Sequence, residues 1–296
     1  MDKTYLSAVG EALGEPRKVS ELATSADTDL TALIEEIAHF RESPRDIWEL
    51  AADAAEQTLA HSPHPPDLIV YVSENDPDTA ASLARLGQRL RLPAAEHLAL
   101  SGRDCGNLAP ALETASALLA TGRYERVLLV LADRARAGRR VMASGLSVFS
   151  DGAAACLLTR RPPAAGPVLR VEAVAGRTAV RPDDDPARQG VLTTARLASD
   201  SVAALLDVSG LTWEDVTQVV LPNYRPTAQR FLTAALGVPA GRLALGRVTD
   251  IGHCFSADPL LTVGRRAAAG ALAAGDVLLT AVFGPHTCSA IAFRRL

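Results

Sequence analysis

The chain has 296 residues, which is enough for one large domain or for two closely packed halves. With 48% hydrophobic and 22% charged residues its composition is ordinary for a soluble globular enzyme, and a formal net charge of −4 at pH 7 disfavours nucleic acid or an anionic membrane as a partner. No apolar run has the length of a membrane span, the N-terminus MDKTYLSAVG lacks the pattern of a signal peptide, and the four cysteines form no CxxC pair. We therefore expect a cytoplasmic protein with neither a zinc site nor a disulfide scaffold.

The first part of the chain is predicted to alternate helices with apolar strands. The run LIVYVS has strand length and no polar alternation until its last residue, which is typical of a strand buried on both faces. In chain order, the predicted elements are a short strand at 5–9, helices at 29–40 and 46–60, a strand at 68–73, helices at 79–90 and 109–120, a strand at 126–131 and a strand within 148–159.

The clearest boundary is RRPP at 160–163, which divides the chain into an N-terminal half, 1–163, and a C-terminal half, 164–296. After the boundary the order of elements repeats, with strands at 168–175 and 218–221, helices at 193–206, 229–236 and 260–274, and strands at 277–283 and 288–295. This pattern indicates an internal duplication of an α/β unit. If a pseudo-twofold axis relates the two units, the equivalent loops that carry Cys105 and His253 converge at one centre.

Cys105 lies just ahead of the predicted helix 109–120, which has Pro110 in its first turn. The positive end of that helix favours a thiolate, and a thiolate is a good nucleophile toward thioesters. A lone cysteine can equally be a small buried hydrophobe. Cys156 and Cys288 lie in apolar strands and fit that second description, as does Cys254 beside His253.

A nucleophilic cysteine opposite a histidine from a duplicated half resembles the pattern of thiolase-like enzymes. Over essentially its full length, the chain resembles the β-ketoacyl-acyl-carrier-protein synthase III branch of that superfamily. The segments that carry the resemblance are Asp104-Cys105-Gly106, LVLADR (129–134), FSDGAAACLL (149–158), LPNYRPTAQRFL (221–232), DIGHCFSADP (250–259) and GDVLLTAVFGPHT (275–287). The resemblance implies an α/β thiolase fold, with two pseudo-twofold halves packed as a five-layer αβαβα sandwich, and a homodimer.

The resemblance also implies roles for site residues. The family's cysteine takes an acyl group from a thioester, and this role falls on Cys105. Its histidine falls on Asn223 and its asparagine falls on His253, so the two residues have exchanged positions. In condensing enzymes of the family both side chains donate hydrogen bonds to the thioester oxygen. At its new position, His253 can instead act as a general base for an alcohol or amine that attacks the acyl-enzyme. Members altered at these positions include acyltransferases of natural-product pathways.

Other departures from the family concern the substrate and the oxyanion hole. Residues 25–43 contain no counterpart of the tryptophan that holds the adenine of coenzyme A, which favours a carrier-protein phosphopantetheine thioester over acyl-CoA as co-substrate. The final glycine cluster reads Gly284-Pro285-His286, and Pro285 has no N–H to donate. His286 either enters the site or has a capping role, and no permanently bound cofactor is implied.

Two further candidates have open alternatives. Asp250 either orients His253 by accepting its second ring proton or belongs to a turn. The basic run RARAGRR at 134–140 is either a solvated loop or a dock for an acidic carrier protein.

These observations favour an acyltransferase that forms an acyl-enzyme on Cys105 and passes the acyl group to an oxygen, nitrogen or sulfur nucleophile in specialised metabolism. The alternatives are a decarboxylative Claisen condensing enzyme that uses a malonyl thioester, or a degenerate, non-catalytic thiolase-fold subunit.

Overall fold

The computed structural model describes residues 3–22, 30–179 and 191–296. Within these ranges, nine strands form one large sheet and two form a small one. The large sheet contains β1 (Thr4–Leu13), β4 (Leu68–Val72), β5 (Glu96–Leu100), β6 (Arg126–Asp133), β7 (Gly152–Thr159), β8 (Val168–Thr178), β9 (Val216–Val220), β10 (Val277–Gly284) and β11 (Thr287–Arg295). The small sheet pairs β2 (Glu15–Lys18) with β3 (His39–Glu42).

The helices alternate with these strands, as the sequence predicts. They are α1 (Thr31–Glu36), α2 (Ile47–Leu59), α3 (Thr79–Arg89), α4 (Leu108–Ala120), α5 (Val191–Ser209), α6 (Pro226–Ala235), α7 (Val248–Ile251) and α8 (Asp258–Ala268). The described residues also contain three single 3₁₀ turns: η1 (Val19–Glu21), η2 (Asp104–Gly106) and η4 (Phe255–Ala257).

The strand order of the large sheet, β5-β4-β6-β7-β1-β8-β11-β10-β9, reads as a duplicated unit. Outward from the β1–β8 pair, each side has two antiparallel pairings followed by a parallel one. Thus β7, β6 and β4 on one side match β11, β10 and β9 on the other. Residues 160–163, the predicted boundary, connect β7 to β8 where the two halves meet.

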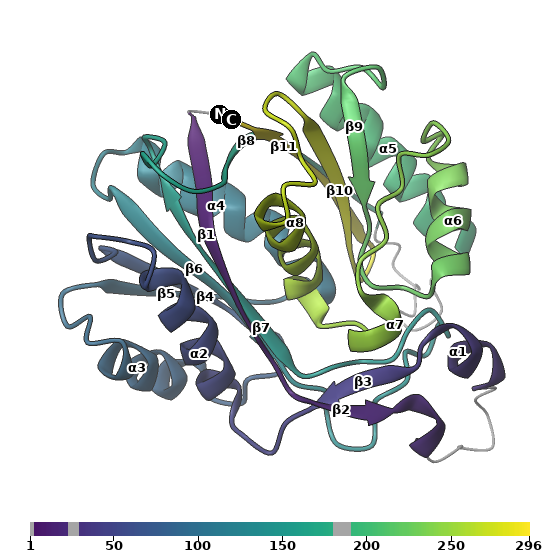
Figure 1. The fold of residues 1–296 in the computed structure, drawn as a ribbon, viewed down its shortest axis with the longest axis horizontal. Coiled ribbons are helices and arrows are strands. Elements are labelled where there is room, and N and C mark those ends of the chain that lie inside the picture. The colour runs from purple at the N-terminus through teal and green to yellow at the C-terminus, as the bar shows by residue number, and fades with distance from the viewer. Residues whose placement is uncertain (1–2, 23–29, 180–190) are drawn as a thin grey trace.

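Two pairs of helices cover the outer faces of the sheet. Helices α2 and α3 pack on the first half, where Leu50 and Leu86 meet Ile69 of β4. Helices α5 and α6 pack on the second half, where Leu205 and Leu232 join another buried cluster. Figure 1 shows the first pair beside one flank of the sheet and the second pair beside the other.

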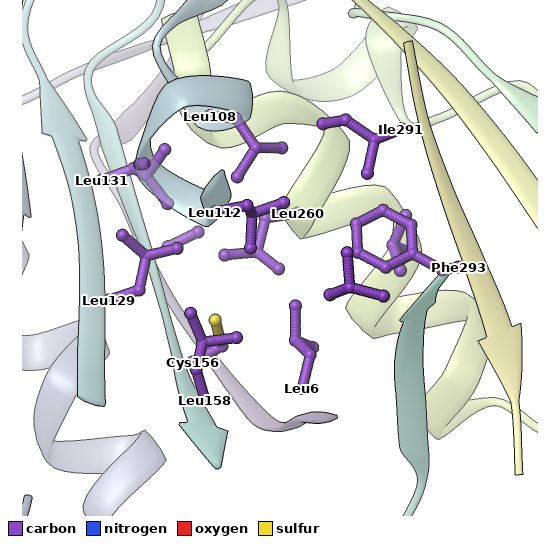
Figure 2. Packing of buried hydrophobic residues seen from close by; sticks show 14 of the residues in the cluster. Leu6, Leu108, Leu112, Leu129, Leu131, Cys156, Leu158, Leu260, Ile291 and Phe293 are labelled. Carbon is purple, nitrogen blue, oxygen red and sulfur yellow. The ribbon is translucent and has the colours of Figure 1, made fainter. Parts of the chain in front are cut away.

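Helices α4 and α8 form the middle layer between the two halves of the sheet. Leu112 of α4 and Leu260 of α8 belong to one buried cluster with Leu6, Leu129 and Phe293, which come from strands of both halves (Figure 2). Helix α4 is apolar around most of its surface, as a helix covered on both sides requires. The layers are therefore αβαβα, and the start of α4, with Cys105 just before it, lies at the centre of the molecule.

Several elements differ from the sequence-based expectation, and β2, β3 and α7 were not predicted. The helix expected at 29–40 ends at Glu36, and its last residues enter β3, which pairs with β2. The helix expected at 260–274 ends at Ala268. Strand β5 was not predicted, because it is an exposed edge strand and lacks the continuous apolar run of the buried strands.

The middle layer predicts which side chains stabilise the fold. Leu112→Ala removes a fully buried side chain from α4 and should lower the free energy of unfolding by about 2–5 kcal/mol, because it leaves a cavity between the two halves. Urea unfolding followed by circular dichroism measures the change. Val208→Ala in α5, at a side chain that is 64% exposed, is the control and should change stability by less than about 0.5 kcal/mol. Equal losses in both variants would contradict a packed middle layer.

Candidate active site

The loop that carries Cys105 is held by one carboxylate at the end of a neighbouring strand. Glu74 follows β4, and its Oε2 accepts hydrogen bonds from the backbone N–H of Gly102 (2.7 Å) and Asp104 (3.2 Å). The same oxygen accepts a bond from Nδ2 of Asn107 (3.1 Å). Because these donors lie on both sides of Cys105, the position of the thiol depends on Glu74.

Glu74 is in turn positioned by Asp133, the last residue of β6. Asp133 Oδ1 accepts bonds from Ser73 Oγ (3.0 Å), Glu74 N (3.0 Å) and Asn75 N (2.8 Å). Burial raises the pKa of Asp133 from 3.8 to about 7. The ends of β4 and β6 and the Cys105 loop are therefore joined by one buried polar network.

Burial also changes the expectation for Cys105. The residue is 5% exposed, and burial together with the charges of Asp104, Asp133 and Asp258 raises the pKa of its thiol well above the usual value. The sequence-based argument from the helix end predicted the opposite direction. Desolvation outweighs the helix dipole here because a helix end contributes about 0.3–2 kcal/mol, whereas full burial can shift a pKa by about 3–5 units. The raised pKa favours the thiol over the thiolate at Cys105.

His253 lies against this thiol. Its Nε2 is 3.0 Å from Cys105 Sγ, and its Nδ1 pairs with Oδ2 of Asp258. The backbone of His253 is bonded on both sides to the segment before β7, from His253 N to Val148 O (2.8 Å) and from Ser150 N to His253 O (2.8 Å). The predicted convergence of the Cys105 and His253 loops is thus confirmed.

Asp258, and not Asp250, faces His253. Asp258 is fully buried at the first position of α8 and also accepts a bond from Cys254 N (2.6 Å). Of the two alternatives for Asp250, the orientation of His253 is wrong: its carboxylate is half exposed and lies 3.4 Å from Nε of Arg247. Asp250 belongs to the short helix α7, which presents it to solvent, whereas the 3₁₀ turn η4 brings the start of α8 back under the histidine.

Asn223 lies on the far side of Asp258. Its backbone N–H donates to Asp258 Oδ2 (2.8 Å) and its Nδ2 is 3.3 Å from Oδ1 of the same carboxylate. A Cβ added to Gly246 would lie 2.4 Å from the Asn223 Oδ1, so the amide packs directly against the backbone of Gly246. One of the two side-chain N–H groups of Asn223 is therefore directed to Asp258.

Aromatic rings enclose His253. The ring centroids of Phe149, Tyr224 and Phe255 lie 5.6, 5.5 and 6.0 Å from that of His253. Burial raises the pKa of the Tyr224 hydroxyl well above its usual value. None of the three was predicted as a site residue, although each lies within or beside a quoted family motif. Such a setting disfavours an unpaired charge, so the imidazolium form of His253 depends on Asp258.

The turn between β10 and β11 packs against the Cys105 loop. A Cβ on Gly106 would lie 3.1 Å from Gly284 N, and a Cβ on Gly284 would lie 2.3 Å from Arg103 O, so only glycine fits at Gly284. His286 is buried in this turn with φ 55°, and its carbonyl oxygen accepts a bond from Ala179 N (2.9 Å). A direct role of Gly284 or His286 in the chemistry stays a prediction.

The basic run at 134–140 is partly structural. Arg140 pairs with the buried carboxylate of Asp151 (2.5 Å) and with Glu42 (3.3 Å), and Arg134 lies 3.7 Å from Asp151. These two side chains hold the entry to β7, which leaves Arg136 and Arg139 as exposed residues of the run.

Comparisons with known proteins identify the family. A family model for 3-oxoacyl-[acyl-carrier-protein (ACP)] synthase III matches residues 102–175. Over 280 residues the chain is 30% identical to beta-ketoacyl-[acyl-carrier-protein] synthase III 3 of Streptomyces coelicolor, a match that covers 82% of this chain and 81% of that protein. The chain belongs to the β-ketoacyl-acyl-carrier-protein synthase III family. A synthase III of Rubrobacter xylanophilus is 29% identical over 191 residues, which are 59% of this chain and 60% of that protein.

Solved structures show the same fold. ChlB3, described as an "aceyltransferase", has a TM-score of 0.84 at 22% identity and covers 99% of this chain and 97% of its own. The synthase III of Pseudomonas aeruginosa has a TM-score of 0.80 at 21% identity and covers 98% of both chains. This synthase III-like chain therefore has the thiolase fold of these structures. In the part of the chain that the structure describes, no helix has the length and apolar character to cross a membrane.

The buried network around the synthase III-like site predicts a pH dependence of stability. Because the pKa of Asp133 is about 7 in the fold and 3.8 as its reference value, the folded state binds this proton more tightly than the unfolded state. The Asp133 contribution to the free energy of unfolding is therefore full at low pH and falls as pH rises through this interval. Asp133→Asn should remove this part of the pH dependence in urea unfolding series. Asp207→Asn, at an exposed position, should keep the parental slope, and a parental slope in Asp133→Asn would contradict the assignment.

Proposed function

We propose that the protein is an acyltransferase of specialised, natural-product metabolism that forms an acyl-enzyme on Cys105 and transfers the acyl group to an oxygen, nitrogen or sulfur nucleophile. The observation that carries the proposal is the continuous contact from the Cys105 thiol through both ring nitrogens of His253 to the buried Asp258. A cysteine, a base and a carboxylate that orients the base form the arrangement of covalent acyl transfer.

In the first step, His253 takes the proton of the Cys105 thiol. The contact with Asp258 assigns a proton to Nδ1 of His253, which leaves Nε2 free to accept one. The Sγ thiolate then attacks the thioester carbonyl of the donor. The carbon–sulfur bond of the donor breaks, the departing thiolate takes the proton from Nε2, and Cys105 carries the acyl group.

In the second step, the same nitrogen acts on the acceptor. His253 takes a proton from the attacking hydroxyl, amine or thiol, the new bond to the acyl carbon forms, and the bond to Sγ breaks. Sγ then recovers the proton from Nε2. In both steps Asp258 stabilises the transient imidazolium, and its own position is set by Cys254 N and by the amide of Asn223.

The geometry gives less support to a decarboxylative condensation. That reaction uses two side-chain donors on the thioester oxygen, and here the Asn223 amide is directed to Asp258. The carboxylate of Asp104, with Oδ1 3.6 Å from Cys105 Sγ, would also repel the carboxylate of a malonyl unit. The contact between His253 and Cys105 equally disfavours a non-catalytic subunit, because such a subunit has no need of a base against a buried thiol.

The family supports our proposals for the donor and the assembly. Relatives of the chain are named for the acyl carrier protein, and we propose a carrier-protein phosphopantetheine thioester as donor, with acyl-CoA as the second choice. We also propose a cytoplasmic homodimer that pairs β5 with its copy, since β5 ends the large sheet and is mostly exposed.

The first test is the intact mass of the protein after incubation with acyl thioesters on coenzyme A and on carrier protein. We expect a mass gain of one acyl group that is lost in Cys105→Ala. Cys156→Ala is the matched control and should load normally, because that thiol is buried in β7, where burial raises its pKa. Native mass spectra of the same samples report the dimer. A folded protein that gains no mass from any donor would refute the acyl-enzyme.

The second test compares the two aspartates near His253. Asp258→Asn should lower the rate of acyl-enzyme formation by about a hundredfold or more, because the imidazolium loses its partner. Asp250→Asn, at the half-exposed position that pairs with Arg247, should stay within about twofold of the parent. Rates come from rapid quench followed by mass spectrometry. Comparable losses in the two variants would remove Asp258 from the proposed mechanism.

A further inference from the structure

Asp104, the neighbour of Cys105, has a backbone conformation that side chains rarely adopt. Its φ is 50°, in the left-handed region, where a non-glycine residue is uncommon and strained. Three contacts impose this conformation: Glu74 Oε2 accepts the Asp104 N–H, while Asn107 Nδ2 (2.8 Å) and Ser256 Oγ (2.9 Å) donate to the Asp104 carbonyl oxygen. They come from the ends of β4, η2 and η4, so the surrounding fold determines the conformation.

The imposed conformation directs the Asp104 carboxylate toward the nucleophile. Its Oδ1 lies 3.6 Å from Cys105 Sγ. Among the described residues no lysine, arginine or histidine forms an ion pair with Asp104, whereas Asp258 is paired with His253. A fixed and unpaired negative charge therefore lies beside the reacting sulfur.

This charge works against the first step of the proposed reaction. A carboxylate next to a thiol disfavours the thiolate, and Asp104 is the first of the charged groups that raise the pKa of Cys105. A residue that three contacts hold beside the sulfur although its charge opposes thiolate formation is explained if its charge serves a different step.

The charge of Asp104 can serve the second step of the proposed reaction, the transfer of the acyl group to the acceptor. Once Cys105 carries an acyl group, its sulfur is neutral and no longer repelled by Asp104. The carboxylate then lies within a few ångströms of the acyl carbon that the acceptor attacks. Unit charges at such a distance beside a half-buried carboxylate interact, so an acceptor with a positive group beside its nucleophile is attracted and an anionic one is repelled.

We propose that Asp104 selects the acyl acceptor by charge, and that the acceptor is an alcohol or amine that carries a protonated amino group close to the attacking atom. This proposal rests on the proposed function. During transfer the ammonium group keeps its proton and faces Asp104, while the attacking hydroxyl or second amine gives its proton to His253. The bond from the acceptor to the acyl carbon forms, the bond to Sγ breaks, and Sγ takes the proton from His253.

The test begins with charge selection at the thiol, which requires no acyl transfer. Cys105 is modified with methanethiosulfonates that carry an ethylammonium or an ethylsulfonate group. Each rate is divided by the rate of the same reagent with free cysteine, and the ratio of the two corrected rates measures the preference for the cationic reagent. Cys105→Ala supplies the background. The parent should prefer the cationic reagent by about tenfold or more, and Asp104→Asn should bring the ratio near unity. Asparagine is the suitable variant because it tolerates the left-handed region and removes only the charge.

The second part measures transfer from the loaded enzyme. Parent and Asp104→Asn are loaded with the same acyl group, and its loss is followed by intact mass with ethanolamine, ethylene glycol or glycolate present. The parent should react about tenfold faster with ethanolamine than with ethylene glycol, and slowest with glycolate, while Asp104→Asn should not discriminate.

The outcomes separate the two proposals. Normal loading with the same selectivity in parent and Asp104→Asn overturns the role of Asp104 and leaves the acyltransferase intact. Failure of every thioester to load Cys105 overturns the acyltransferase. If no thioester loads Cys105, the modification experiment still tests charge selection. An equal ratio of the rates with the cationic and the anionic methanethiosulfonate in parent and Asp104→Asn would overturn it.

Discussion

The site depends on the buried carboxylate of Asp258. A carboxylate without solvent is costly unless its oxygens are bonded, and here Cys254 N, Asn223 and His253 supply the partners. Those partners come from the loop after β9 and the loop before α8, so the carboxylate joins two segments of the second half and presents the imidazole to Cys105 of the first half. Removing the side chain would release all of these contacts at once, which makes Asp258 a structural as well as an electrostatic centre.

The duplicated fold explains why Cys105 and His253 meet. Each half contributes the loop that lies just before a middle-layer helix, α4 in the first half and α8 in the second. Since both helices pack in one cluster, their N-terminal ends are brought to the same place (Figure 2). The close contact of Gly106 with Gly284 adds a third segment, the β10–β11 turn, to this meeting point. A larger residue at Gly284 would push the Cys105 loop away from it.

The electrostatics of the site are unusual for a thiol nucleophile. Asp104, Asp133 and Asp258 all act against a thiolate, and His253 is the group placed to receive the thiol proton. Under the proposed mechanism, the thiol proton moves to His253 when the donor thioester is present, because the raised pKa favours the thiol before that point.

The sequence by itself determined the class of fold and the convergence of two residues. Apolar runs of strand length, alternating with helical spacing and repeated after 160–163, predict the duplicated α/β fold, and the duplication predicts that the loops of Cys105 and His253 meet, as their contact shows. Only the tertiary structure decided between Asp250 and Asp258, which lie three residues before and five after the histidine and are equally available in the sequence. The direction of a side chain depends on backbone angles that distant contacts set: η4 turns α8 toward His253, and Glu74, Asn107 and Ser256 hold Asp104 in its left-handed conformation. Edge strand β5 and the pair β2–β3 escaped prediction for the same reason, because strand pairing stabilises them more than their own residue patterns do.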